Sequence, residues 1–128
     1  MKTNRPKTIL LVDDEPNIIE LYGALLAKAG FTIISATNGP DAIKLAAARR
    51  PDLILLDFSM PGMNGAEVVA KLKANPETKD IAVVFISAVG DPNFTDADVQ
   101  AAQNLGSTDF IRKGMTNEEF VAKVKTYL

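Results

Sequence analysis

The chain contains no cysteine and no histidine. The lack of cysteine excludes disulfide bonds, thiolate metal sites and a cysteine nucleophile, and it fits a reducing cytosol. The lack of histidine excludes serine–histidine catalysis and any phosphohistidine on this chain. Both absences narrow the chemistry that is open to the protein before any motif is considered.

Long apolar segments and blocks of basic residues are also missing. The first apolar run, residues 9–12, stops at Asp13, which is too short for a signal-peptide core or a membrane span. The net charge is −2 and no Lys/Arg-rich stretch occurs, so nothing suggests direct nucleic-acid binding. The 128 residues are 47% hydrophobic and 23% charged, which is the balance of one globular domain. We predict a cytoplasmic protein with a tail over residues 1–6 and one domain over residues 7–128.

Apolar runs and helical patterns alternate five times along the chain. Strands are predicted over residues 8–12, 31–36, 53–56, 81–86 and 108–112. Helices are predicted over residues 16–29, 41–49, 66–74 and about 95–105, with a last one, marked by the apolar face 120, 121, 124, 127 and 128, that ends the chain. Residues 38–40, Asn-Gly-Pro, are predicted as a turn.

This alternation predicts an α/β fold in which a parallel sheet carries helices on both faces. The first, third and fourth strands are the most continuously apolar, so they should be central. The expected strand order is 2-1-3-4-5, the doubly wound order of flavodoxin-like folds, with five strands and five helices.

Polar side chains follow several strands of the predicted sheet. The acids at residues 13–15 come after the first strand and Asp57 after the third, while Ser87 closes the fourth and Lys113 lies just past the fifth. Because parallel strands end at one edge of a sheet, these groups should share a crevice. Taken singly, the acids could cap a helix, the serine could simply close a strand, and the lysine could be solvated. Their joint occurrence favours a shared function.

The chemistry that suits this set is phosphoryl transfer to a carboxylate. Clustered carboxylates repel one another unless a cation lies among them, and hard oxygen ligands favour Mg²⁺. Asp57 is then a plausible nucleophile that forms an acyl phosphate. Lys113 and Ser87 can contact the other phosphoryl oxygens, since catalysis of this transfer is mainly positioning and charge.

Five segments of the chain resemble the receiver domains of two-component response regulators, in particular the single-domain, chemotaxis-regulator-like ones. They are residues 10–16 (LLVDDEP), 55–65 (LLDFSMPGMNG), 86–88 (ISA), Gly106 and residues 109–113 (DFIRK). The resemblance covers nearly the whole chain, from about residue 7 to residue 128, and its motifs are specific in combination.

The resemblance implies that Asp57 accepts a phosphoryl group from a sensor histidine kinase or a histidine phosphotransfer protein. It also implies that Asp14, Asp57 and the backbone carbonyl of Ser59 ligate Mg²⁺, with Asp13 acting through water. Ser87 and Phe110 match the family's switch pair. The face formed by the fourth helix, fifth strand and fifth helix would then change for a separate output protein, with no membrane and no nucleic acid involved directly.

Two positions and the length of one segment depart from the family pattern. Gly114 stands where proline usually follows the lysine, often after a cis bond; without proline a cis bond costs about 3 kcal/mol. We therefore expect either a trans bond with Lys113 aimed differently or a strained cis bond. The segment from Ser87 to Lys113 is about four residues longer than usual, with the extra residues expected in 88–95. Phe110 replaces the commoner tyrosine, so a hydroxyl contact is lost.

The sequence leaves alternatives open beside a stand-alone receiver that catalyses only its own phosphorylation and dephosphorylation. One is a receiver cut from a longer protein. Another is a pseudo-receiver scaffold that is phosphorylated rarely or never. Gly114 and the long loop favour this alternative. The third is a Mg²⁺-dependent phosphohydrolase of the haloacid-dehalogenase type, but those enzymes usually have a second aspartate where this chain has Ser59.

Overall fold

The computed structural model describes residues 6–58, 60, 62, 65–87, 100, 104, 109–112 and 115–128, with only the backbone described at Ser87 and Arg112. Its elements are β1 (Thr8–Val12), α1 (Pro16–Lys28), β2 (Thr32–Ala36), α2 (Gly39–Arg49), β3 (Leu53–Asp57), α3 (Gly65–Ala74), β4 (Ala82–Ser87), β5 (Asp109–Arg112) and α5 (Asn117–Lys125). The helix predicted at about 95–105 lies outside the described residues, apart from Gln100 and Asn104. These two are helical, and the Gln100 amide donates a hydrogen bond to Asn104 Oδ1 at 3.3 Å.

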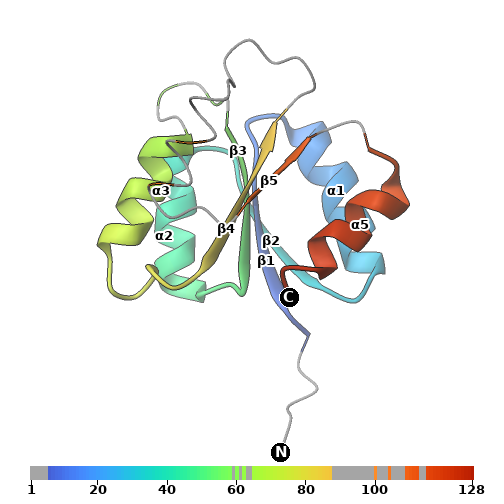
Figure 1. Cartoon of the computed structure of the whole chain (residues 1–128), viewed down its shortest axis with the longest axis horizontal. Helices are drawn as coiled ribbons and strands as arrows, with labels where there is room; N and C mark the ends of the chain where they lie inside the picture. The colour runs from blue at the N-terminus through green and yellow to red at the C-terminus, as the bar shows by residue number, and fades with distance from the viewer. Residues whose placement is uncertain are drawn as a thin grey trace, which may run out of the picture.

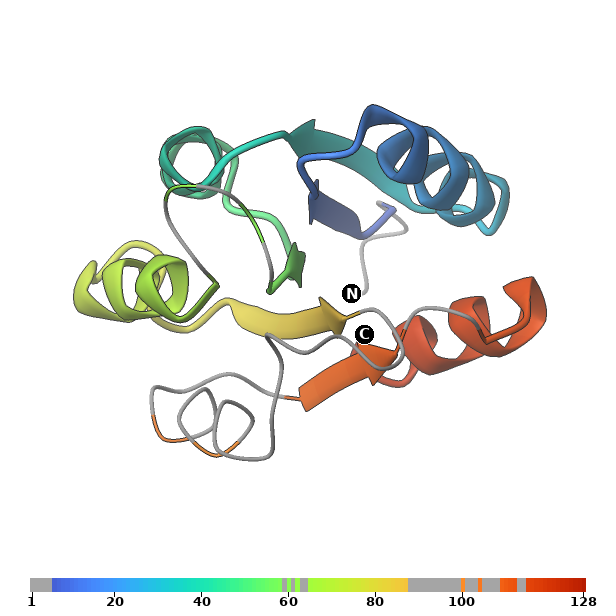
Figure 2. The same cartoon turned by 90° about the horizontal axis from the view of Figure 1, so that it is seen from above.

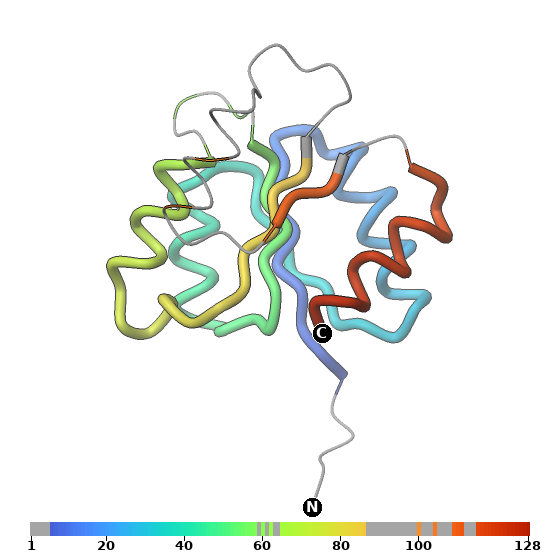
Figure 3. The backbone as a smooth tube through the Cα atoms, in the orientation of Figure 1, coloured from blue at the N-terminus to red at the C-terminus, as the bar shows by residue number. Residues whose placement is uncertain are grey.

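Five parallel strands form one sheet in the order β2-β1-β3-β4-β5. Helices α2 and α3 cover one face of this sheet, and α1 and α5 cover the other (Figures 1 and 2). The predicted doubly wound fold and strand order are confirmed. The backbone trace shows the strands ending at the same edge of the molecule, at the top of Figure 3.

The core consists of two layers, one on each side of the sheet, because successive strand residues point to opposite faces. Leu10 and Ile54 belong to the layer under α2 and α3, while Leu11 and Leu55 belong to the layer under α1 and α5. All residues of β3 are buried. Continuous apolar runs in β1, β3 and β4 are thus explained by burial of both faces.

The turn predicted at residues 38–40 is wrong, because α2 begins at Gly39. Asn38 is the N-cap residue: its Oδ1 accepts the backbone N–H of Asp41 at 2.8 Å. Pro40 then falls in the first helical turn, where a missing N–H costs nothing. A cap and a turn use the same residue types, which is why local sequence did not separate them.

The last helix also differs from its prediction, because α5 ends at Lys125 and a turn follows. Phe120 and Val124 are buried as expected, whereas Leu128 is 36% exposed. Among the helices of the described residues, none has the length and apolar content that a bilayer span requires.

Candidate functional site

Two buried carboxylates lie at the ends of adjacent central strands. Asp57 is the last residue of β3, one residue beyond the predicted strand end, and Asp13 directly follows β1. The strands pair with Val12 opposite Leu56, so both acids leave the sheet at the same level. Asp57 is 5% exposed and Asp13 is 2% exposed. Aspartate side chains are seldom buried to this degree unless they have a partner, so two of them at the same end of the sheet indicate a functional site.

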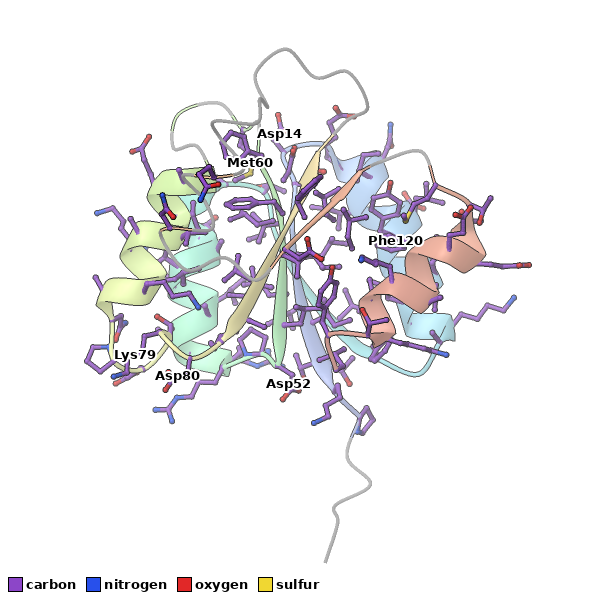
Figure 4. The ribbon with its side chains drawn as sticks, viewed as in Figure 1. Asp14, Asp52, Met60, Lys79, Asp80 and Phe120 are labelled. Carbon is purple, nitrogen blue, oxygen red and sulfur yellow. The ribbon has the colours of Figure 1, made fainter. Side chains whose placement is uncertain are left out.

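Asp14 completes a group of three carboxylates. One oxygen from each of Asp13, Asp14 and Asp57 lies within 4.8 Å of the other two. Asp14 remains accessible to solvent, and Figure 4 shows it at the end of the molecule where the strands end. Carboxylates from the ends of β1 and β3 therefore lie close together, as the sequence predicted.

Glu15 does not belong to this group, although it is the third acid of the same run. Its side chain is exposed, and it serves as the N-cap residue of α1 without a side-chain cap hydrogen bond. Its backbone N–H donates to Asp13 Oδ1 at 2.9 Å, and the N–H of Asp13 donates to the carbonyl of Ala36 at 3.2 Å. The first bond holds the Asp13 side chain and the second its backbone at the strand end, while the chain turns into the helix.

The donor set of this acidic group suits a hard cation. Three carboxylates this close repel one another, and burial of two of them strengthens the repulsion. Oxygens on opposite sides of a Mg²⁺ ion are separated by roughly 4.2 Å, twice the usual bond length. The three oxygens lie within 4.8 Å of one another, close enough for these residues to share one metal ion.

The loop after Asp57 is anchored in the core by aromatic and sulfur-containing side chains. Phe58 and Met60 are both buried in the layer under α2 and α3. The Phe58 ring packs edge-on against Phe85 with centroids 5.2 Å apart and an interplanar angle of 75°. The Phe58 N–H donates to the Ile86 carbonyl and its carbonyl accepts the Gly65 N–H, both at 3.1 Å. The sequence analysis treated this segment as turn residues and did not predict that Phe58 and Met60 are buried. The presence of large apolar residues in a loop was the only indication of it.

Several predicted site residues fall outside the description. Ser59, Lys113, the Lys113–Gly114 bond and the longer segment 88–95 lie outside the described residues, as does the side chain of Ser87. The backbone of Ser87 ends β4 and pairs with Arg112, the residue before Lys113. The positions and roles of the residues outside the description stay predictions.

Phe110, the predicted switch aromatic, lies on β5 opposite Phe85. Its side chain is partly buried and packs against the core layer under α2 and α3. The preceding residue, Asp109, receives three contacts: the Phe110 N–H at 2.8 Å, the Tyr127 hydroxyl at 2.7 Å and the Lys123 ammonium at 3.6 Å. The Asp109 carboxylate therefore links the backbone of Phe110 to Lys123 on α5 and to Tyr127 in the turn after it.

These contacts shift the titration of both groups. Burial alone would raise the pKa of Asp109, but the hydrogen bonds from Tyr127 and the Phe110 N–H, together with the Lys123 charge, outweigh it and lower that pKa. Burial, with the hydrogen bond to Asp109, raises the pKa of Tyr127. A carboxyl whose pKa is lowered by folding stabilises the fold above its unfolded pKa, and this contribution is lost as pH falls.

We expect Tyr127→Phe to lower the free energy of unfolding at pH 7 by roughly 0.5–1 kcal/mol, the value of one partly exposed hydrogen bond. The difference from wild type should shrink as pH falls below about 4, where Asp109 becomes protonated in the unfolded chain and then in the folded one. Urea unfolding at pH 7, 5 and 3 measures it. Asp109→Asn is the matched background, in which Tyr127→Phe should show little pH dependence. An unchanged difference at pH 3 in the wild-type background would contradict the assignment.

Comparison with known proteins gives one consistent family. The response regulator receiver domain family matches residues 9–125. The chain is 31% identical over 123 residues to the polar-differentiation response regulator DivK of Brucella anthropi, covering 96% of this chain and 97% of DivK. It is 38% identical over 122 residues to the phosphate regulon transcriptional regulatory protein PhoB of Pseudomonas aeruginosa, covering 95% of this chain and 52% of PhoB. The chain thus spans about half the length of PhoB.

A solved structure of similar fold is the chemotaxis protein CheY4 of Vibrio cholerae. The TM-score is 0.88, and the match covers 97% of this chain and 100% of that one. The sequence identity is 23%, so this likeness concerns the fold alone.

Proposed function

Since the chain belongs to the response regulator receiver domain family, whose members are the receivers of two-component phosphorelays, we propose that it accepts a phosphoryl group on Asp57 and changes its partner binding in response. The observation that supports this best is the buried Asp57 carboxylate at the end of β3, with its oxygen within 4.8 Å of those of Asp13 and Asp14. A nucleophile in that place is positioned by the strand and lies near two carboxylates that could help to hold a cation.

The transfer uses the Asp57 carboxylate as the attacking group. One oxygen attacks the phosphorus of a phosphohistidine in line with the leaving imidazole, so a phosphorus–oxygen bond forms as the phosphorus–nitrogen bond breaks. When bound, Mg²⁺ would neutralise negative charge around the acceptor and grip one phosphoryl oxygen. Asp14, Asp57 and the Ser59 carbonyl are the proposed ligands, with Asp13 acting through water.

The remaining roles are carried over from the resemblance residue by residue. Lys113 would neutralise a second phosphoryl oxygen, and Ser87 would donate a hydrogen bond to the third. Phe110 would follow Ser87 inward when the hydroxyl turns toward the phosphoryl group. The hydrogen bond of its N–H to Asp109, which also holds Tyr127, offers a route by which that movement reaches α5.

The proposed donor is a sensor histidine kinase or a histidine phosphotransfer protein, since no histidine occurs on this chain. The proposed acceptor of the signal is a separate output protein, as DivK, a response regulator, matches this chain over 97% of its length. We place the receiver over residues 7–128, in the cytoplasm, as a binding switch and not as an enzyme acting on other substrates.

Incubation with acetyl phosphate tests the proposal without knowledge of the kinase. Intact mass should show one phosphoryl adduct when Mg²⁺ is present and none when the metal is chelated by EDTA. No adduct under either condition would favour the scaffold alternative. Continuous release of phosphate from a phosphomonoester, such as para-nitrophenyl phosphate, would favour the hydrolase. Equal adduct in EDTA would contradict the metal site.

A further inference from the structure

Phe85 lies on β4, the strand between β3 and β5, in the core layer under α2 and α3. Its side chain is 1% exposed, and its ring packs edge-on against Phe58 with the centroids 5.2 Å apart. A Cβ atom added to Gly65 would lie only 2.5 Å from Phe85 Cε1, so the ring also lies against the first residue of α3. Phe85 therefore contacts both ends of the loop that connects Asp57 with α3.

Phe110 is the neighbour of Phe85 on the adjacent edge strand. The two residues are paired in register on β5 and β4, so their side chains leave the sheet on the same face, with the strands about 4.8 Å apart. Phe110 packs against the same core layer, although its side chain is only partly buried. Phe85 thus lies between the predicted switch aromatic and the loop that follows Asp57.

Backbone hydrogen bonds fasten this loop to the strand that carries Phe85. The Phe58 N–H donates to the carbonyl of Ile86 at 3.1 Å, and the Phe58 carbonyl accepts the Gly65 N–H at 3.1 Å. Ile86 directly follows Phe85 and pairs with Asp57 across β4 and β3. A displacement of Phe85 therefore reaches Asp57 through its neighbour Phe58 and through the strand itself.

Core filling alone would account for a large apolar side chain on β4, since its residues 83–86 are all buried. The contacts of Phe85 go further, because they join two segments that the proposed switch has to connect. Phe110 can turn inward only into space that its neighbours leave, and a densely packed protein interior leaves little. Its inward turn must therefore displace the Phe85 ring, and Gly65 and Phe58 limit where that ring can go.

We propose that Phe85 is a positioning residue that couples the side chain of Phe110 to the Asp57 acceptor. The inference rests on the proposed function, because it states how that site and the switch aromatic communicate. An inward Phe110 presses the Phe85 ring against Phe58, whereas an outward Phe110 leaves the position of Phe58 unchanged. Coupling of this kind is reciprocal, so a change at Phe110 should alter the affinity of the acceptor site for a phosphoryl mimic, and Phe85 should carry the effect.

A double-mutant cycle measures this coupling through the dissociation constant of beryllofluoride in the presence of Mg²⁺, followed by fluorine nuclear magnetic resonance. Phe110→Leu should change that constant at least about threefold in the wild-type background, and the change should disappear in the Phe85→Leu background. The same fold-change in both backgrounds, including no change, would overturn the proposal. A wild-type chain that binds no beryllofluoride would contradict the proposed function and this inference with it, so the two failures are distinguishable.

Leu10→Ala is the matched control. Leu10 is buried in the same core layer, but β3 and β4 separate its strand from β5, a distance of roughly 14 Å. Phe110→Leu should therefore keep its full effect in the Leu10→Ala background. Urea unfolding checks that each variant is folded, and a purely structural Phe85 would change stability but leave the effect of Phe110→Leu on beryllofluoride binding intact. If Phe85→Leu does not fold, Phe85→Met, whose flexible side chain adapts better to the space, should abolish the effect in the same way.

Discussion

Replacing Asp57 by asparagine is expected to abolish phosphorylation of the protein by acetyl phosphate and Mg²⁺. Asparagine has nearly the same shape, but its neutral amide is a poor nucleophile and its oxygen is a weaker ligand for the cation. The buried position at the end of β3 is kept, so the loss should concern chemistry and not folding. Intact mass spectrometry measures the result as the fraction of chain carrying one phosphoryl group.

Asp52→Asn is the matched control for this substitution. Asp52 lies at the opposite edge of the sheet (Figure 4), where its Oδ2 accepts the Thr8 N–H at 2.8 Å. Asparagine can still accept that bond, so phosphorylation should equal that of wild type. A phosphoryl adduct on folded Asp57→Asn in the same yield as wild type would show that another side chain is the acceptor. Circular dichroism of both variants checks the fold.

Gly65→Ala is expected to destabilise the protein by roughly 1–3 kcal/mol, the usual cost of inserting a methyl group into a filled core. A Cβ atom at Gly65 would lie 2.5 Å from Phe85 Cε1 and 3.1 Å from the Cα of Phe58. Phe85 is 1% exposed and packs edge-on against Phe58, so its ring has little room to move. Any shift of the Phe58 backbone also moves its neighbour Asp57, so slower phosphorylation by acetyl phosphate should accompany the loss of stability.

Gly23→Ala makes the same change where space is available. A Cβ atom at Gly23 meets only Ile33 Cγ2, at 3.7 Å, which is an ordinary contact. Because Gly23 lies within α1, alanine should raise the free energy of unfolding by roughly 0.5–1 kcal/mol. Urea unfolding should show a lower free energy of unfolding for Gly65→Ala and a higher one for Gly23→Ala, each compared with wild type. A stability of Gly65→Ala equal to wild type would mean that the core under the acidic loop can rearrange freely.

The acidic site was largely predictable because its position follows from strand ends. Continuous apolar runs identified the central strands, and parallel strands end at one edge. Asp13 and Asp57 were therefore expected to meet although 44 positions separate them in the chain, and the structure confirms it. The third acid of the run, Glu15, was expected there as well, and it lies outside the group.

The difference between Glu15 and its neighbours depends on backbone direction. Asp13 still extends the strand, with its N–H bonded to Ala36, whereas Glu15 has already turned to begin α1. Three adjacent acids look alike in a sequence, so only the bend after the strand decides which of them join Asp57. The same holds for Asn38, which the structure shows to be the N-cap residue of a helix that begins at Gly39.

The sequence by itself determined the alternation of strands and helices, the order of the strands and the acids available at their ends, since each depends on local composition and on the direction of parallel strands. Only the tertiary structure decided which acids share a site, how Gly65 admits the Phe58 and Phe85 rings, and that residues of α1 and α5 line a common groove. These features depend on how distant side chains pack, and packing distances are not written in any local pattern of residues.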